Sequence, residues 1–420
     1  MARFLYSSLF ILLLPVVFLS LYLRGSKSPA YRQRWLERIG MNRPLQLNKS
    51  IWVHAVSVGE VIAAVPLVRE FQRRYPDYSI VVTTMTPTGS DRVKAIFGDS
   101  VYHQYLPYDI PWALGRFIKK TAPQICIVME TELWPNLIHQ CYRRNIAVVV
   151  SNARLSESSA AGYRRLKSLS KKMLGEVGRV LAQTEIEGQR FVSLGLPPAN
   201  LQVTGSLKFD IEIEDRLRDV ALELRQDWLH RPCLIAASTH QGEDELILDA
   251  FNLIRQSHGD ALLILVPRHP ERFEQVAALL DKRQYSFVRR SHAAAVNDDH
   301  AVLLGDTMGE LLTLLGAADI AFVGGSLVDT GGHNVLEPIA MGVATITGPH
   351  TFNFQAITEL LLQRNGITVV SDEINLAQVC VGFFTSPDAA SAQVSRGNAV
   401  LNENKGALAK QLQAIDELIC

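Results

Sequence analysis

The sequence has few cysteines, and none is placed for a disulfide framework or a zinc site. The five cysteines, at positions 126, 141, 233, 380 and 420, are scattered and include no Cys-x-x-Cys pair. Such a set is typical of a reducing compartment. The eleven histidines are also dispersed, and the sequence has neither an HExxH motif nor the Asp-x-Asp triplet that often holds a divalent ion on a nucleotide diphosphate. We therefore predict no bound metal.

An excess of charge of one sign is also lacking. The 42 lysine and arginine residues balance 42 aspartate and glutamate residues, so the formal net charge is zero. Proteins that follow a phosphate backbone usually carry a basic excess, so this balance argues against a nucleic-acid partner. With 420 residues, 48% of them hydrophobic, the chain is long enough for two or three domains that each bury a core.

The clearest targeting feature is an apolar run at the N-terminus. Residues 4–23 are mostly apolar, and about twenty such residues can cross the hydrocarbon core of a bilayer. Basic residues follow the run at Arg24, Lys27, Arg32, Arg34 and Arg38. Positive charge favours the cytoplasmic side, so we predict an uncleaved membrane anchor at residues 1–24, with the rest of the chain in the cytoplasm.

Two alternatives to a spanning anchor stay open. A cleaved secretory signal is one, although no Ala-x-Ala-like cleavage site follows the run. The other is a helix that dips into one leaflet, which Pro15 inside the run allows.

Short apolar runs alternate with helical patterns in the first half of the chain. The runs are residues 51–56, 79–84, 125–129, 146–150 and 180–182, with helical patterns such as 61–74 and 136–145 between them. Nearly continuous apolar strands alternating with helices are typical of a parallel sheet covered on both faces. The alternation runs from residue 48 to about residue 210, and we predict a doubly wound domain over residues 25–210.

A second alternating series follows a charged, helical segment, residues 211–231, which we interpret as a connector. Its strand-like runs are residues 234–237, 261–266, 286–288, 302–304, 320–323, 344–347 and 367–370. We predict a second doubly wound domain over residues 232–420, closed by a terminal helix near residues 405–418. Open α/β sheets bind ligands at the carboxyl ends of their strands, so the two domains are expected to face a ligand cleft.

Residues 321–354 are the most glycine-rich stretch of this second series. An apolar strand leads into glycines at positions 324, 325, 331 and 332, and a helix is expected to begin near Asn334. Glycines let the backbone approach a ligand, and free N–H groups at a helix start suit an anion, which predicts a phosphate site. The alternative is a turn whose glycines only allow close packing.

Three side chains at strand ends of the first domain are candidates for chemistry. Glu60 follows the first strand and opens a helix, where it can act as a general base or simply complement the helix dipole. Glu130 leaves an apolar strand together with Glu132, for catalysis or for pairing with Arg154. Lys208 can neutralise a developing negative charge, or it can be an ordinary surface lysine.

Several turns of the second domain suit an anion. Residues 236–245 and 305–312 each place a glycine-containing turn before a helix, and Arg268 lies at a strand end between two prolines. Together with residues 321–354, these turns share one predicted sheet edge and indicate a nucleotide site.

Eight motifs, in order behind the apolar run, carry a family resemblance. They are HAVSVGE, METELWPN, SNARLS, TGSLKFD, PRHPER, DTMGEL, GGHNVLEP and GPHTFNF. Over essentially its whole length the chain resembles the 3-deoxy-D-manno-octulosonic acid (Kdo) transferases of Gram-negative lipopolysaccharide assembly. The resemblance implies an α/β fold of the GT-B type, with two Rossmann-like domains and the nucleotide in the second. It also implies CMP-Kdo as donor, a lipid A precursor at the inner membrane as acceptor, and no further cofactor.

The resemblance also implies roles for individual residues. Glu60 is expected to accept the proton of the acceptor hydroxyl, while Glu130 and Lys208 support the transition state. The residues expected to hold CMP are Pro267, Arg268, Met308, Gly309, Glu310, Asn334, Val335, Leu336 and Glu337, the last on the ribose.

The expected reaction inverts the anomeric carbon, and the basic residues after the anchor are expected to attract anionic lipids. Two other hypotheses remain. One is a GT-B transferase that uses a UDP-sugar on another membrane glycolipid, and the other is a catalytically silent, membrane-tethered nucleotide-binding protein.

Overall fold

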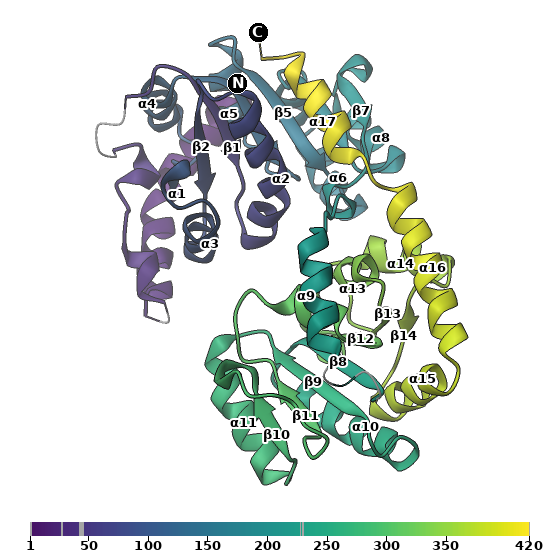
Figure 1. The fold of residues 1–420 in the computed structure, drawn as a ribbon. Coiled ribbons are helices and arrows are strands. Elements are labelled where there is room, and N and C mark those ends of the chain that lie inside the picture. Colours follow the sequence, from purple (N-terminus) through teal and green to yellow (C-terminus); the bar gives the residue numbers. More distant parts are fainter. Residues whose placement is uncertain (1, 27, 42–45, 227, 229–230, 420) are drawn as a thin grey trace. The chain divides into compact units, whose positions relative to one another are not determined.

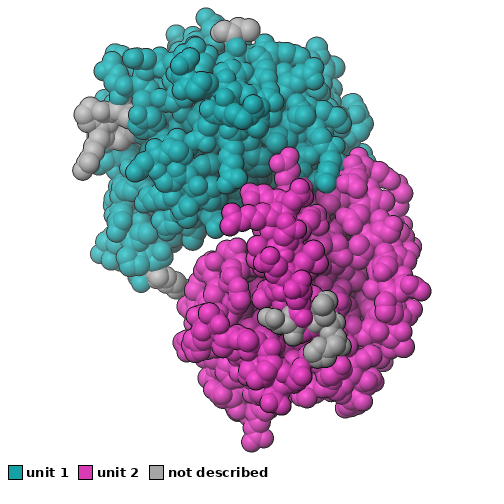
Figure 2. All heavy atoms as spheres, in the orientation of Figure 1, with its two compact units in different colours: residues 1–210, 405–420 teal, residues 211–404 magenta. Residues whose placement is uncertain are grey.

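The computed structural model describes residues 2–419 except residues 27, 42–45, 227 and 229–230. Lys27 of the predicted basic cluster and Cys420 therefore lie outside the described residues. The chain divides into two compact units, coloured separately in Figure 2. Unit 1 comprises Met1–Asp210 and Lys405–Cys420, and unit 2 comprises Ile211–Asn404.

Unit 1 is built on a seven-stranded parallel sheet with the strand order β3-β2-β1-β4-β5-β6-β7. Its strands are β1 Ser50–His54, β2 Ser79–Thr84, β3 Tyr102–Tyr105, β4 Pro123–Met129, β5 Ala147–Ala153, β6 Arg179–Ala182 and β7 Leu201–Val203. Its helices are α1 Ala2–Arg24, α2 Val58–Arg74, α3 Pro87–Phe97, α4 Pro111–Thr121, α5 Pro135–Tyr142, α6 Glu157–Arg165, α7 Lys167–Leu174, α8 Glu185–Leu194 and α17 Ala407–Asp416. The elements alternate along the chain as predicted (Figure 1).

Unit 2 repeats this plan with a seven-stranded parallel sheet in the order β10-β11-β9-β8-β12-β13-β14. Its strands are β8 Cys233–Thr239, β9 Leu262–Pro267, β10 Phe287–Arg289, β11 Val302–Leu304, β12 Ile320–Val323, β13 Ala344–Thr347 and β14 Thr368–Val369. Its helices are α9 Asp215–Gln226, α10 Glu243–Ser257, α11 Phe273–Lys282, α12 Leu311–Gly316, α13 Leu336–Met341, α14 Gln355–Gln363, α15 Glu373–Thr385 and α16 Pro387–Glu403.

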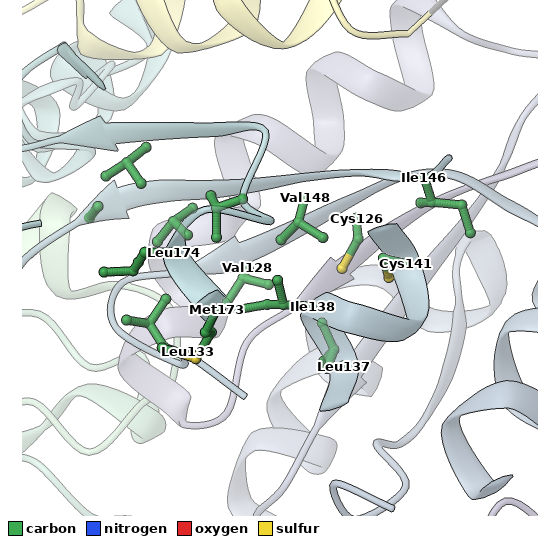
Figure 3. Close-up of a cluster of buried hydrophobic side chains, with 14 of the residues drawn as sticks. Cys126, Val128, Leu133, Leu137, Ile138, Cys141, Ile146, Val148, Met173 and Leu174 are labelled. Carbon is green, nitrogen blue, oxygen red and sulfur yellow. The ribbon is translucent and has the colours of Figure 1, made fainter. Parts of the chain in front are cut away.

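Both faces of each sheet are buried, which explains the nearly continuous apolar strands. Along β1, Ile51 and Val53 enter one hydrophobic cluster, whereas Trp52 enters another on the opposite face. Successive strand residues point to opposite faces, so a strand covered on both sides must be apolar at every position. Figure 3 shows the cluster around Cys126 and Cys141, and the four described cysteines are all free and buried in such apolar surroundings.

The C-terminal helix differs from the prediction, because it belongs to unit 1 and does not close the second domain. The Asp210 carboxylate accepts the backbone N–H groups of Gly406 and Leu408, both at 2.6 Å. On α17, Gln411 is fully buried and accepts the hydroxyl of Ser151 of β5. The predicted connector differs too, since α9 packs into the core of unit 2 through Ala221.

The N-terminal helix α1 packs along one side of unit 1. Phe10, Leu14, Val17, Phe18 and Leu21 form a cluster with side chains of the globular part, and these are Tyr31, Trp35, Met85, Tyr108, Ile110 and Ala113. Ser7 also exchanges hydrogen bonds with Asn136 of α5. By length and composition α1 could cross a membrane. Its other faces expose large apolar side chains, including Phe4, Leu5, Leu9, Leu12, Val16 and Leu19.

The predicted basic cluster after α1 is divided in the structure. Arg24 and Arg32 are exposed. Arg34 instead forms an ion pair with Glu37, and Arg38 is buried, with its guanidinium 4.2 Å from the ring centroid of Tyr105. Only part of the predicted basic surface is therefore accessible among the described residues.

Candidate functional site

Glu60 lies in the first turn of α2, directly after β1. Ser57 caps the helix, and its hydroxyl donates to one Glu60 carboxylate oxygen at 2.9 Å. The other carboxylate oxygen accepts the backbone N–H of Val56 at 2.8 Å. These two hydrogen bonds fix the carboxylate at the carboxyl end of the strand. Glu60 is therefore placed to complement the dipole of α2, as one prediction had it. Whether it can also act as a general base depends on the charge of its carboxylate.

The surroundings of Glu60 tune it for proton transfer near neutral pH. Burial raises the pKa of Glu60, the nearby carboxylates of Glu132 and Glu130 also raise it, and the two hydrogen bonds lower it, which together puts the pKa at about 7. A carboxylic acid with a pKa near the working pH can take up a proton and release it again. A raised pKa is what a general base needs, and the role of Glu60 as that base stays a prediction.

Glu130 and Lys208 lie at the same edge of the unit 1 sheet. Glu130 follows β4 in the left-handed region at a φ of 55°, which is uncommon for a residue with a side chain. Burial lowers the pKa of Lys208, and the nearby Glu130 carboxylate counteracts the shift, so the two side chains interact. Lys208 is therefore not an ordinary surface lysine. The alternative was that Glu130 and Glu132 form ion pairs with Arg154. Among the described residues, neither glutamate forms an ion pair with Arg154.

The predicted CMP-binding residues of unit 2 follow the carboxyl ends of neighbouring parallel strands. Pro267 ends β9 and Arg268 follows it, Met308, Gly309 and Glu310 follow β11, and Asn334, Val335, Leu336 and Glu337 follow β12. Parallel strands end at a common edge, so the structure brings these segments together at one side of the sheet. Their role in binding stays a prediction.

The turn after β12 differs from the predicted phosphate site. The fully buried Glu243 of α10 accepts the N–H groups of Gly325 at 2.6 Å, Ser326 at 3.0 Å and Leu327 at 2.9 Å. A Cβ atom at Gly324 would lie 2.9 Å from the Glu243 carboxylate, so glycine is needed for this approach. These N–H groups are already occupied, which restricts the predicted anion site to the later part of the stretch.

That later part is organised by Asn334. Its side-chain oxygen accepts the Leu336 N–H at 3.1 Å, and its amide group donates to the Glu337 carboxylate at 3.1 Å. Burial raises the pKa of Glu337 against this hydrogen bond and the nearby Arg268. Asn334 thus lies just before α13, bonds its first residue and orients the Glu337 carboxylate. That this carboxylate receives ribose hydroxyl groups stays a prediction.

The segment after β11 is held by charge. The Glu310 carboxylate pairs with the guanidinium of Arg290 at 2.8 Å and accepts the hydroxyl of Thr307. Its side chain is therefore committed within unit 2, whereas Met308 is 64% exposed and Gly309 has a φ of 87°. If this segment contacts a nucleotide, Met308 and the backbone around Gly309 are the accessible groups.

Within the described residues, no group of three or more His, Cys, Asp or Glu side chains could hold a metal ion. That the reaction needs neither metal nor cofactor stays a prediction.

Comparisons with known proteins decide the family. Residues 33–211 match the family described as 3-Deoxy-D-manno-octulosonic-acid transferase (kdotransferase). A relative from Haemophilus influenzae, named 3-deoxy-D-manno-octulosonic acid transferase, is 47% identical over 419 residues, covering 99% of this chain and 98% of the relative. The chain belongs to the Kdo transferase family. A relative of the same name from Bordetella pertussis is 34% identical over 394 residues, covering 90% of each chain.

The predicted resemblance, fold class and enzyme class are thereby confirmed. The chain is a Kdo transferase with two parallel sheets of the GT-B type. A solved glycosyltransferase from Rickettsia africae has the same fold, with a TM-score of 0.56 and 14% identity over 89% of this chain and 99% of that chain. Identity this low concerns the fold alone.

The sequence-based prediction missed residues whose roles depend on contacts between distant loops. Ser57, three residues before Glu60, has the spacing of a capping box and could have been found. In the sequence, Glu243 is one of several acidic residues at the start of a helix, so it does not stand out. His240 and His333 are 93 positions apart. No local pattern indicates that these two histidines touch.

Proposed function

We propose that this Kdo transferase moves Kdo from CMP-Kdo to a lipid A precursor at the cytoplasmic face of the inner membrane, with inversion of the anomeric carbon. The observation that carries the proposal is the 47% identity to a Kdo transferase over nearly the whole of both chains. The tuned Glu60 carboxylate supports the chemistry, because a lipid hydroxyl is a poor nucleophile until its proton is removed.

In the proposed step, the acceptor oxygen attacks the anomeric carbon of Kdo and its proton passes to the Glu60 carboxylate. The bond from the anomeric carbon to the phosphate oxygen breaks, and its electron pair leaves with CMP. A single displacement of this kind inverts the anomeric carbon. Lys208 and Glu130 support the developing charge near the base, while Arg268, the Met308–Glu310 segment and Asn334–Glu337 hold CMP. The proposed base thus belongs to unit 1 and the proposed donor-binding residues belong to unit 2.

Nucleotide competition separates the proposal from the alternative of a UDP-sugar donor. Transfer of labelled Kdo to the purified acceptor should be inhibited by CMP and not by UDP at the same concentration. Inhibition by UDP alone, with transfer from a UDP-sugar, would establish the alternative instead. A protein that binds CMP but transfers no sugar would favour the catalytically silent hypothesis.

The pKa of Glu60 predicts a pH dependence of transfer. The base must be unprotonated, so kcat/KM should fall about tenfold per pH unit below pH 7 and level off above it. The folded pKa lies above the unfolded value, so ionising Glu60 destabilises the fold as pH rises from about 4.5 to 7. Glu60→Gln should therefore gain thermal stability relative to wild type between pH 5 and pH 8. A transfer rate that is flat from pH 5.5 to 8 would contradict the assignment.

We further propose that α1 lies along the membrane surface and does not cross the bilayer. The helix spans 23 residues, about 34 Å, and is packed on unit 1 from Ser7 to Leu21. Crossing the bilayer in this packing would carry Trp35, Tyr108 and their neighbours into the lipid. An in-plane helix instead places its exposed apolar side chains in one leaflet, with Arg24 and Arg32 available to anionic headgroups.

Membrane binding should depend on the exposed face of α1. Leu12 and Val16 are 75% and 61% exposed, so the double variant Leu12→Glu and Val16→Glu should fold normally. Each buried Leu or Val contributes roughly 1.5–3 kcal/mol, so binding should weaken at least about tenfold. The measurement is flotation with vesicles of phosphatidylethanolamine and phosphatidylglycerol. The control is Ile186→Glu on α8, where the side chain is 68% exposed, and equal flotation of both variants would contradict the assignment.

A further inference from the structure

Three histidines and an arginine gather at the carboxyl edge of the unit 2 sheet. His240 follows β8, Arg268 and His269 follow β9, and His333 lies in the loop after β12. The Nε2 atoms of His240 and His333 are 2.8 Å apart, and their rings stack at 5.0 Å with an angle of 12° between planes. The His269 ring lies 5.4 Å from that of His240, edge to face. Loops from three adjacent strands therefore converge on one His240–His333 pair.

The groups that surround the His240–His333 pair are mainly basic. Burial lowers the pKa of His240 and of His333, and Arg268 and His269 also lower both by repulsion, which together puts the pKa of His333 at about 4. Arg272 acts on His240 in the same direction. Among the described side chains, Arg268 forms no ion pair.

The carboxylates near the pair are committed to other partners. Glu243 accepts four backbone N–H groups, including that of His240 at 3.1 Å. Asp244 pairs with Arg272 and accepts the Thr239 hydroxyl. Glu337 accepts the Asn334 amide. The cluster thus has hydrogen-bond donors and positive charge that a bound anion would complement.

The backbone holds the two imidazoles in place. The Gly332 N–H donates to the Gly325 carbonyl at 2.7 Å, which closes the loop that carries His333. A Cβ atom at Gly325 would lie 3.1 Å from the His333 ring. On the other side, Glu243 ties the backbone of His240 to the same Gly325 turn. A site fixed in this way can select a ligand with little reorganisation.

On the basis of the proposed function, we infer that His240 and His333 bind the carboxylate of the donor sugar and select an acidic sugar over a neutral one. In CMP-Kdo the carboxylate and the phosphate oxygen are attached to the same carbon. The protein must therefore bind both anionic groups within one small site. Arg268 lies beside the pair and serves the phosphate side. The carboxylate replaces the bond between the two imidazoles and accepts an N–H from each. A neutral hexose offers no such acceptor, so the two imidazoles would keep the bond between them and contribute no hydrogen bond to that ligand.

The test compares CMP with CMP-Kdo on the full-length protein. Calorimetry is done without acceptor. His240→Gln and His333→Gln should each lower the affinity for CMP-Kdo about 10- to 100-fold, as expected for a lost charge-assisted hydrogen bond. Affinity for CMP should change less than about twofold, which also shows that the variants are folded. The matched control is His292→Gln, an exposed histidine of the same unit. Binding of CMP-Kdo to wild type should also take up more protons than binding of CMP, because an adjacent anion raises the pKa of imidazole.

The outcomes separate the inference from the function on which it rests. Wild-type protein that binds neither CMP nor CMP-Kdo refutes the proposed function, and the inference with it. Wild-type protein that binds both, with variants that keep CMP-Kdo affinity or lose both ligands in parallel, refutes the inference alone. Selective loss of CMP-Kdo supports it.

Discussion

Glu60→Gln is expected to bind CMP normally and to lose about 10²- to 10⁴-fold in the rate of Kdo transfer, the usual contribution of a general base. The substitution keeps the size of the side chain, and the amide oxygen can still accept the Val56 N–H. The amide cannot accept a proton from the acceptor hydroxyl. The loss should therefore appear in kcat, with CMP affinity and the fold retained. Steady-state transfer at saturating concentrations of donor and acceptor measures it.

A control on the same helix makes the result specific. Glu70 of α2 pairs with Arg73 and Arg74 on the surface, so Glu70→Gln removes one negative charge from α2 without touching the proposed base. Its transfer rate should stay within about twofold of wild type, since surface pairs contribute little. Near-normal turnover of Glu60→Gln would remove Glu60 from the role of base.

Glu243→Ala is expected to have the largest effect on the donor unit. The substitution leaves the N–H groups of His240, Gly325, Ser326 and Leu327 without their acceptor. Each buried donor without a partner costs about 1–3 kcal/mol, so the free energy of unfolding should fall by about 3 kcal/mol or more. The loop that leads to Asn334 depends on this turn, and CMP affinity should fall with it. Denaturant unfolding and calorimetry with CMP measure the two effects.

Glu245 provides the matched control for Glu243. It lies in the same first turn of α10 and carries the same charge, but its side chain is exposed. Glu245→Ala should change the free energy of unfolding by less than about 0.5 kcal/mol. If the two variants unfold alike and bind CMP alike, Glu243 does not hold the donor loops.

The strands could be predicted from the sequence wherever they are buried on both faces. The runs at residues 79–84, 302–304 and 320–323 coincide with β2, β11 and β12. The edge strand β3 was missed, because Tyr102 is exposed and the strand is not a continuous apolar run. The alternation of elements thus follows from the apolar pattern, while β3 depends on tertiary pairing.

The position of the C-terminal helix could not be predicted in the same way. Its apolar face, with Leu412 and Ile415, indicates only that α17 packs against some sheet. The helix packs on unit 1 because Asp210 caps it and because Gln411 makes buried hydrogen bonds with Ser151 and Thr204. These partners are separated from α17 by about two hundred positions or more, so no local pattern contains them.

The candidate site was predicted in part, for a physical reason. Parallel strands end at one edge, so Glu60, Glu130 and Arg268 could be placed near strand ends from the sequence alone. The electrostatics could not be predicted, because the raised pKa of Glu60 depends on burial and on two carboxylates from another loop. Likewise, the N–H groups after β12 looked free until the structure placed Glu243 against them.

Mass spectrometry of the acceptor tests the central claim most directly. Purified lipid A precursor is incubated with CMP-Kdo and the wild-type protein, with Glu60→Gln in parallel. We predict that wild type adds the mass of one or more Kdo residues to the precursor and releases CMP, while the variant leaves the precursor almost unchanged. A precursor that the wild-type protein leaves unmodified would contradict the account. Equal modification of the precursor by wild type and by Glu60→Gln would contradict it too.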